Sequence, residues 1–418
     1  MLTDAGAGVA TSSNAYRGST VKLLLLAAAM FMVGTNASVI AGLLPRIAHG
    51  LGTTQGTVSY SITVYSVTVA VVAPLASIVL ARVPRAVIMA CGAAFFSIGT
   101  IVASESVNVG GFFGGRAIAA LGGAALVPTA SAVATDLVPP ERRGRALALV
   151  AAGFTLASAF GTPLGTALGS AATWRLPMEA LAAIGVLVGV GIAFGFRSMP
   201  RPVVVPLRHR LAPLADRRVL ATVSTTLFMV VAGNVVFIFS ATLTAPATGG
   251  SGTRLAVLLM VYGCAGLIGN QFAGRLTDRF GSRHIAITAI CAVAALLVTL
   301  PFAVESYALC LTVFAAWGLV ASGTSVPIQH RLVAIDPEVA PVTMSWNSTA
   351  MYVGIALAPP VGNLAISLGG SRFTPIPAAL CVVLALVAFL VGLRPLRAAA
   401  SATQAAGMGD AETGVPGA

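Results

Sequence analysis

Arg116 is the only ionisable residue that falls clearly within an apolar stretch of this 418-residue sequence. A cation at that depth is costly and is by default a candidate for function. Two roles are open from the residue alone. Arg116 either binds a ligand or senses protonation in an internal cavity, or it lies near the outer end of a helix and extends to the membrane surface.

The other polar residues within apolar stretches are mainly amides and aromatic rings. A polar group in hydrocarbon must find a partner, so each of these side chains either joins neighbouring helices or lines a cavity. A cavity with amides, rings and one arginine favours a neutral or anionic amphiphile over a polycation, which would need carboxylates. These residues are Asn36, Tyr60, Tyr65, Asn234, Tyr262, Asn270, Gln271, Trp317, Asn347 and Tyr352. The candidates for the cavity are Asn36, Asn234, Tyr262, Gln271, Trp317, Asn347 and Tyr352.

No carboxylate lies in the middle of an apolar stretch. A buried carboxylate, whose pKa rises on desolvation, is the obvious proton carrier, so proton coupling has no evident residue here. We expect Asp136 to be a solvated acid at a helix end, and Glu179 to pair with Arg175, four residues before it. Histidine and cysteine lack metal-ligand spacing, so we expect neither a metal site nor a catalytic site.

The elements that position these residues must be membrane-spanning helices. The chain is 57% hydrophobic and 9% charged, and its mean hydropathy is +0.95. A helix needs about 20 apolar residues to cross the hydrocarbon, and the sequence offers roughly twelve such stretches. The ~10-residue alternating segments of an outer-membrane barrel are missing. The sequence predicts an all-α membrane protein with twelve transmembrane helices.

Arginine and lysine fall mainly in alternate loops. If both termini are cytoplasmic, the basic residues outside are only Arg46, Arg175, Arg254 and Arg372, which is a clear positive-inside bias. The net charge of +12 therefore indicates orientation in an inner membrane and attraction to anionic lipid. We expect membrane lipid and a small-molecule substrate as partners, and no nucleic acid.

The two halves of the chain repeat at an offset of 197 residues, at which Arg82 aligns with Arg279 and Arg175 with Arg372. Two parallel six-helix repeats about an axis normal to the membrane characterise one large class of transporters. The pattern predicts an N-terminal cytoplasmic segment at 1–22, a six-helix bundle at 23–196, a cytoplasmic linker at 197–218, a second bundle at 219–395 and a disordered tail at 396–418.

Small residues recur at every fourth position of the fifth predicted span. Such a stripe lets two helix backbones approach closely where lipid gives no hydrophobic drive to association. We expect a packing seam at the boundary between the two repeats, where rocking would occur. The stripe comprises Gly153, Ala157, Gly161, Gly165 and Gly169, with Pro163 beside it.

Three motifs resemble those of the major facilitator superfamily, in particular its twelve-span drug/proton antiporter branch, and the resemblance covers residues 22–395. The run from Gly274 to Arg283 is similar to the loop motif that follows the second span of a half. This resemblance implies a charged clasp that latches the cytoplasmic side in one state. The implied clasp residues are Asp278, Arg279, Gly281, Arg283, Arg82, Glu141 and Arg143.

Arg116, followed by Gly122 and Gly123, partly resembles the fourth-span motif of the same branch, which favours the cavity role for this arginine. The stripe around Gly161 and Pro163 resembles the fifth-span motif that is typical of exporters. The resemblance implies a monomeric secondary transporter that exports small amphipathic compounds by alternating access, without a cofactor and with the proton gradient as energy source. Export of sugars or neutral metabolites, a non-transporting sensor on the same fold, and a membrane enzyme are the alternatives, and we expect no enzyme.

Overall fold

The computed structural model describes residues 5–196 and 212–393, in which every regular element is helical. Twelve helical segments of this part are long and apolar enough to cross a membrane. The predicted twelve-helix, all-α membrane fold is therefore confirmed. The predicted tail at 396–418 and most of the predicted linker at 197–218 lie outside the described residues.

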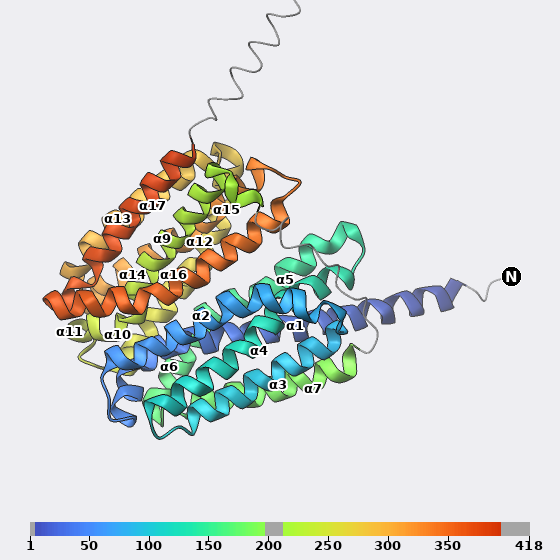
Figure 1. The fold of residues 1–418 in the computed structure, drawn as a ribbon, viewed down its shortest axis with the longest axis horizontal. Coiled ribbons are helices and arrows are strands. Elements are labelled where there is room, and N and C mark those ends of the chain that lie inside the picture. The colour runs from blue at the N-terminus through green and yellow to red at the C-terminus, as the bar shows by residue number, and fades with distance from the viewer. Residues whose placement is uncertain (1–4, 197–211, 394–418) are drawn as a thin grey trace, which may run out of the picture.

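The spans form two groups of six, coloured from blue to green and from yellow-green to red in Figure 1. The first group comprises α1 (Ala5–Gly50), α2 (Gln55–Val79), α3 (Arg85–Ser104), α4 (Val109–Asp136), the fifth span built from α5 (Arg143–Leu156), η3 (Ala157–Gly161) and α6 (Thr162–Ala171), and α7 (Leu176–Gly195). The second comprises α9 (Arg217–Ile238) with the short α10 (Ser240–Leu243) and α11 (Ala245–Thr248), α12 (Gly252–Phe280), α13 (Ser282–Ala303), α14 (Tyr307–Gly323) with α15 (Ser325–Ile335), α16 (Ala340–Gly369) and α17 (Pro375–Gly392). Single turns of 3-10 helix are η1 (Leu80–Arg82), η2 (Pro140–Arg142), η4 (Ala212–Ala215) and η5 (Ser371–Phe373).

Helix α1 is longer than the sequence suggested, because the predicted N-terminal segment at 1–22 is helical from Ala5 onward and continuous with the first span. The helix also runs past Pro45 to Gly50. A proline removes one backbone hydrogen bond, which a long helix tolerates near its end. Gly50 packs against Trp174, since a Cβ at Gly50 would lie 2.4 Å from the indole Nε1.

The two groups form bundles that lie against each other (Figure 1). We call the face with the start of α1 and the end of α17 the terminal face, and the opposite one the far face. In Figure 1 the bundles converge at the far face, near α10 and α11, and diverge toward the terminal face, where α5 and α15 lie apart.

Polar contacts join the bundles through α2 and α16. Near the far face, Asn363 Nδ2 donates to the backbone oxygen of Gly56 at 3.1 Å and to Ser59 Oγ at 3.0 Å. Further along the same two helices, Thr63 Oγ1 donates to the backbone oxygen of Ala356 at 2.8 Å. Because each hydrogen bond crosses from one bundle to the other, together they hold the far face closed.

The backbones of the two bundles also meet directly, midway along α12. A Cβ on Gly263 would lie 2.4 Å from Cα of Ala159 and 2.8 Å from the backbone oxygen of Ser158, both in the π-helical turn η3. Pro163 follows this turn and has no N–H to donate to the Ala159 carbonyl, which accounts for the widened turn. The close approach requires glycine at position 263.

The glycine stripe of the fifth span corrects one expectation, because it does not lie at the boundary between the bundles. A Cβ on Gly153 would lie 2.1 Å from the backbone oxygen of Ala27, and one on Gly165 would lie 2.5 Å from Val39 Cγ2. Ala27 and Val39 belong to α1, so the stripe packs two helices of the same bundle. A different face of the span, at Ala159, meets the other bundle.

The second bundle repeats this packing. A Cβ on Gly354 of α16 would lie 2.9 Å from the backbone oxygen of Leu227 in α9, and one on Gly362 would lie 2.2 Å from the ring of Phe239, which follows α9. At the 197-residue offset, α16 and α9 correspond to the fifth and first spans. The internal repeat in the sequence therefore corresponds to a repeated helix pair in space.

We expect Gly153→Ala to destabilise the protein by about 1–3 kcal/mol, the usual cost of overpacking, because the new Cβ meets backbone that cannot rotate away. Thermal unfolding of purified protein in detergent would measure the loss. The matched control is Gly144→Ala in the same helix, where a Cβ would meet no atom within 4 Å. Equal losses in both variants would show that the contact with α1 is not the cause.

Candidate functional site

Four helices of the first bundle bring a polar cluster around Arg116 of α4. Arg116 is fully buried, and its Nη1 donates to the backbone oxygen of Asn36 at 2.9 Å and also to the side-chain oxygen of Asn36 on α1. Asn36 Nδ2 in turn donates to Thr100 Oγ1 on α3 at 3.2 Å. The ring of Tyr65 on α2 lies 4.5 Å from the guanidinium carbon, within cation–π range.

The edge of the Arg116 guanidinium formed by Nε and Nη2 has no hydrogen-bond partner among the described residues. Its Nε and Nη2, together with the hydroxyl of Tyr65, are buried without a hydrogen bond. No described carboxylate forms an ion pair with it. A buried donor left unpaired is costly, so these groups point to a bound oxyanion, or to polar atoms that approach in another state.

The position of Arg116 does not fit the second of the two roles, a side chain that extends to the membrane surface. A snorkelling arginine would place its charged head at the membrane surface. Here the side chain has no exposed area and its head contacts α1 and α2. The arginine is an internal cation of the first bundle. Tyr65 and Thr100 complete its surroundings. Tyr65 was noted as a polar residue within a span but was not among the cavity candidates, and Thr100 was missed.

The second bundle places an aromatic cluster around Trp317 of α14. The Trp317 and Tyr262 rings are 4.6 Å apart between centroids, and Phe237 and Phe314 extend the cluster at 5.6 and 5.5 Å from Tyr262 and Trp317 respectively. Trp317 is buried and its indole Nε1 has no partner among the described residues. Two predicted cavity residues, Tyr262 and Trp317, are therefore in direct contact.

The remaining predicted cavity residues are not gathered in one place. Asn347 is buried and its Oδ1 accepts a hydrogen bond from Thr226 Oγ1 at 2.6 Å, so it joins α16 to α9. Asn234 Nδ2 donates to the backbone oxygen of Val230 in its own helix at 2.9 Å. Asn234 and Tyr352 are half-buried, and Gln271 is exposed.

The predicted clasp residues lie at the terminal face, but they form no ion pair with one another among the described residues. Asp278 and Arg279 are exposed in the last turn of α12. Gly281, at φ +81°, turns the chain into α13. Four further predicted clasp residues are exposed: Arg82, Glu141, Arg143 and Arg283. A clasp at these residues stays a prediction about a different state.

The sequence analysis missed an ion pair at the terminal face of the first bundle. Arg85, at the start of α3, pairs with Asp136 at the end of α4. Asp136 is exposed at the end of α4, as expected, and the pair with Arg85 is an addition to that expectation. Glu179 differs from expectation, because Arg175 donates instead to the backbone oxygen of Ser106 at 3.0 Å.

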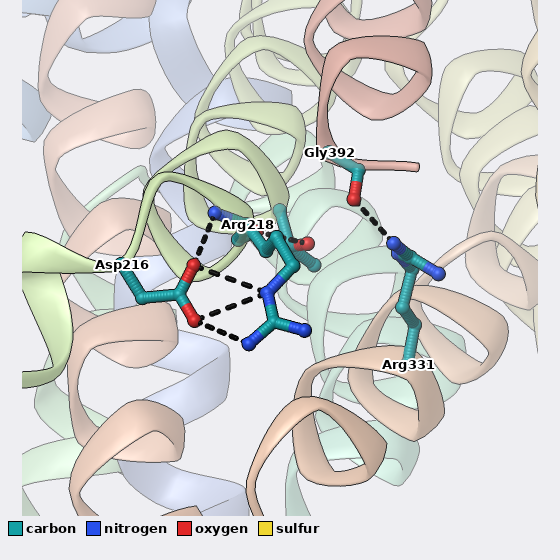
Figure 2. Close-up of polar contacts among 5 residues, drawn as sticks. Asp216, Arg218, Arg331 and Gly392 are labelled. Atoms are coloured by element: carbon teal, nitrogen blue, oxygen red, sulfur yellow. Dashed lines mark hydrogen bonds and ion pairs between the residues drawn. The ribbon is translucent and has the colours of Figure 1, made fainter. Parts of the chain in front are cut away.

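The second bundle has its own polar contacts at the terminal face (Figure 2). Asp216 caps α9 and pairs with Arg218 at 2.8 Å, and the hydrogen bonds from Arg218 lower the pKa of Asp216 below its usual range. Arg331 of α15 donates to the backbone oxygen of Gly392, the last residue of α17. A cation there satisfies a carbonyl that the helix leaves free.

Comparisons with known proteins agree with this fold. The family model of the Major Facilitator Superfamily matches residues 26–338 and 222–413. An uncharacterized MFS-type transporter of Bacillus subtilis, YbcL, is 28% identical over 373 residues, which cover 89% of this chain and 96% of that protein. The inner membrane transport protein YdhP of Escherichia coli K12 is 26% identical over 373 residues, with the same coverage.

One further relative and one solved structure are also similar to this chain. A chloramphenicol resistance protein of Streptomyces lividans is 31% identical over 271 residues, 63% of this chain and 69% of that protein. The crystal structure of a bacterial homologue of the human lysosomal transporter Spinster, inward-facing and unoccupied, superposes with a TM-score of 0.65 at 16% identity over 90% of this chain and 97% of that one. The chain is therefore a multi-pass membrane transporter that belongs to the major facilitator superfamily.

Proposed function

We propose that this transporter exports small amphipathic compounds, neutral or anionic, across the inner membrane by alternating access. The observation that carries the proposal is the unpaired edge of Arg116, which is fully buried. Its Nε and Nη2 face the same side of the planar guanidinium, and such a pair binds a carboxylate or phosphate with two parallel hydrogen bonds. A buried cation without a carboxylate repels a second cation, which argues against polycationic substrates.

Alternating access needs two bundles that close at one face while they part at the other. The contacts of Asn363 and Thr63 between α2 and α16 support a closed far face, and the divergence in Figure 1 supports a parted terminal face. We place the terminal face in the cytoplasm, because most arginines lie in its loops. The binding of substrate must then shift the equilibrium between the state open at the terminal face and the state open at the far face, relative to the same equilibrium in the empty protein.

The proton gradient is the proposed energy source, and its support is the likeness to the antiporter branch rather than a proton carrier inside the membrane. None of the described aspartates and glutamates is buried. The gradient would therefore act through groups at the ends of the spans, such as Asp278.

A second candidate substrate class is a sugar or another neutral metabolite. The observation that favours it is the pair Tyr262 and Trp317, whose rings offer an apolar surface beside the unpaired indole Nε1. A flat apolar face next to a hydrogen-bond donor suits a ligand with an apolar face and hydroxyl groups. The likeness to a chloramphenicol resistance protein favours drug-like compounds over this class.

A growth screen in an efflux-deficient bacterial host tests the proposal. The panel holds matched anionic, neutral and polycationic amphiphiles and several sugars, each with and without a collapsed proton gradient. We expect resistance to anionic or neutral amphiphiles, lost when the gradient collapses. Resistance only to polycations would contradict the proposed substrate class. Resistance that survives the collapse would contradict the energy source alone.

A further inference from the structure

Two hydroxyl groups of α2 are buried beside the guanidinium of Arg116. They belong to Ser61 and Tyr65, and neither has a hydrogen-bond partner among the described residues. We propose that both hydroxyl groups donate to the anionic group of the transported compound, together with Nε and Nη2 of Arg116. Both residues then belong to the binding site of the proposed function, on which this inference rests.

The two hydroxyl groups lie on the side of α2 that packs against α4. The ring of Tyr65 is 4.5 Å from the guanidinium carbon of Arg116, and Ser61 lies one turn earlier on the same side of the helix. The hydroxyl oxygen of a tyrosine is only a short distance from its own ring centre. An oxyanion that accepts from the edge of the guanidinium is therefore within reach of the Tyr65 hydroxyl.

Helix α4 has room for the Tyr65 hydroxyl only because position 123 is glycine. A Cβ at Gly123 would lie 2.8 Å from the hydroxyl oxygen, so a larger residue would displace it. Arg116 and Gly123 are close to two turns apart and lie on one face of α4. The side chain of Tyr65 therefore lies along the same face of α4 that carries the buried cation.

Other hydroxyl groups of α2 are satisfied by the preceding turn of the helix. Ser59 Oγ donates to the backbone oxygen of Gly56 at 2.6 Å, and Thr68 Oγ1 donates to that of Val64 at 2.8 Å. Ser61 makes no such bond among the described residues. A buried hydroxyl group without a partner costs free energy in the empty protein, and a bound oxyanion would remove that cost.

The boundary between the two bundles runs beside these residues. Thr63, which lies between Ser61 and Tyr65 in α2, donates to the backbone oxygen of Ala356 in the second bundle at 2.8 Å. In alternating access one bundle moves against the other along such a boundary. The site thus lies next to the surface through which a substrate would enter and leave.

The donors of the site determine the chemistry of its ligand. Nε and Nη2 of Arg116 can only donate, and the hydroxyl groups of Ser61 and Tyr65 can each donate one hydrogen. An ionised carboxylate only accepts, and its two oxygens offer about four lone-pair positions for these donors. The substrate class that fits is a carboxylate joined to an apolar body.

Isothermal titration calorimetry on the purified full chain in detergent tests the site, with cinnamate as the anionic probe and cinnamamide as its neutral counterpart. Tyr65→Phe keeps the ring beside Arg116 and removes only the hydroxyl group, and Ser61→Ala removes the other one. Each variant should bind cinnamate about tenfold more weakly, the loss expected for one hydrogen bond to a charged group. The loss should be smaller for cinnamamide. The empty Tyr65→Phe protein should unfold at no lower temperature than wild type, because its hydroxyl group has no partner to lose.

Tyr60→Phe is the matched control, because it removes a hydroxyl group from an exposed position of the same helix. It should bind cinnamate as the wild type does. Wild-type affinity in Tyr65→Phe and Ser61→Ala, with weakened binding in Arg116→Ala, would overturn this inference and leave the proposed function standing. A lower unfolding temperature of empty Tyr65→Phe would assign its hydroxyl group a structural role instead. A wild-type protein that binds cinnamamide but not cinnamate would contradict both the inference and the anionic substrate class.

Discussion

Arg116→Ala is expected to weaken the binding of an anionic substrate by about 10- to 150-fold. The reason is that hydrogen bonds to a charged group contribute about 1.5–3 kcal/mol each. The unpaired Nε and Nη2 of Arg116 are available to donate such bonds to the substrate. Equilibrium binding of the best compound from the growth screen, measured on purified protein, gives the affinity. Arg116→Lys keeps the charge but lacks the planar guanidinium, so its affinity should lie between those of the wild type and Arg116→Ala.

The control for that prediction is Arg372→Ala. Arg372 pairs with Glu305 at 3.4 Å, and both side chains are more than half exposed, so its removal should change little. Wild-type affinity in Arg116→Ala, with a folded protein, would mean that the buried arginine is only a structural group. An equal affinity for neutral and anionic members of the panel would point to the same conclusion.

Gly263→Ala is expected to lower the population of the state with a closed far face relative to the other state. The equilibrium constant between the two states should change by about 5- to 150-fold, which corresponds to an overpacking cost of about 1–3 kcal/mol. The added Cβ would lie 2.4 Å from Cα of Ala159 in the opposite bundle, and helix backbone cannot yield locally. Spin labels at Thr54 and Ser367, which are exposed at the far face of the two bundles, would report a longer distance. The five cysteines are first replaced by serine.

Gly114→Ala is the matched control for Gly263→Ala. Gly114 is a helical glycine whose added Cβ would meet no atom within 4 Å, so the label distance and the transport rate should stay at wild-type values. If Gly263→Ala gives the wild-type distance distribution, the backbone contact does not hold the closed state. A change in both variants would reflect a general effect of losing glycine from a span.

The twelve spans were predictable because each one must satisfy its own backbone hydrogen bonds in lipid, which leaves a long apolar stretch in the sequence. The extra length of α1 was not predictable in the same way. Hydropathy reports only the part of a helix that crosses hydrocarbon, whereas α1 runs from Ala5 past Pro45 to Gly50. Helix ends are therefore known only where packing is known, as at Gly50.

The cluster around Arg116 was half predictable. Arg116 and Asn36 stood out because each is polar in an apolar stretch, yet their contact joins residues 80 positions apart. Thr100 was missed because a threonine alone in a helix gives no signal of its partner, and Tyr65, although noted as polar within a span, was not placed in the cavity. The pair of Arg85 and Asp136 was missed for the same reason, since the two residues lie on different helices.

The glycine stripe illustrates a different limit. Its spacing correctly indicated a close helix contact, but a stripe does not identify the helix that it faces. The structure assigns it to α1 through Ala27 and leaves the boundary between bundles to Gly263 and the turn η3. The chemistry of a face is thus readable from sequence, whereas its partner is not.

Flux across a membrane by the purified protein is the most direct test of export. Liposomes that contain the full chain are loaded on one side with the compound selected in the growth screen, and its movement is followed with and without a proton gradient. We predict directional accumulation that depends on the gradient and is strongly reduced in Arg116→Ala. Tight binding of the compound without any flux would contradict the export function and would indicate a sensor on the transporter fold.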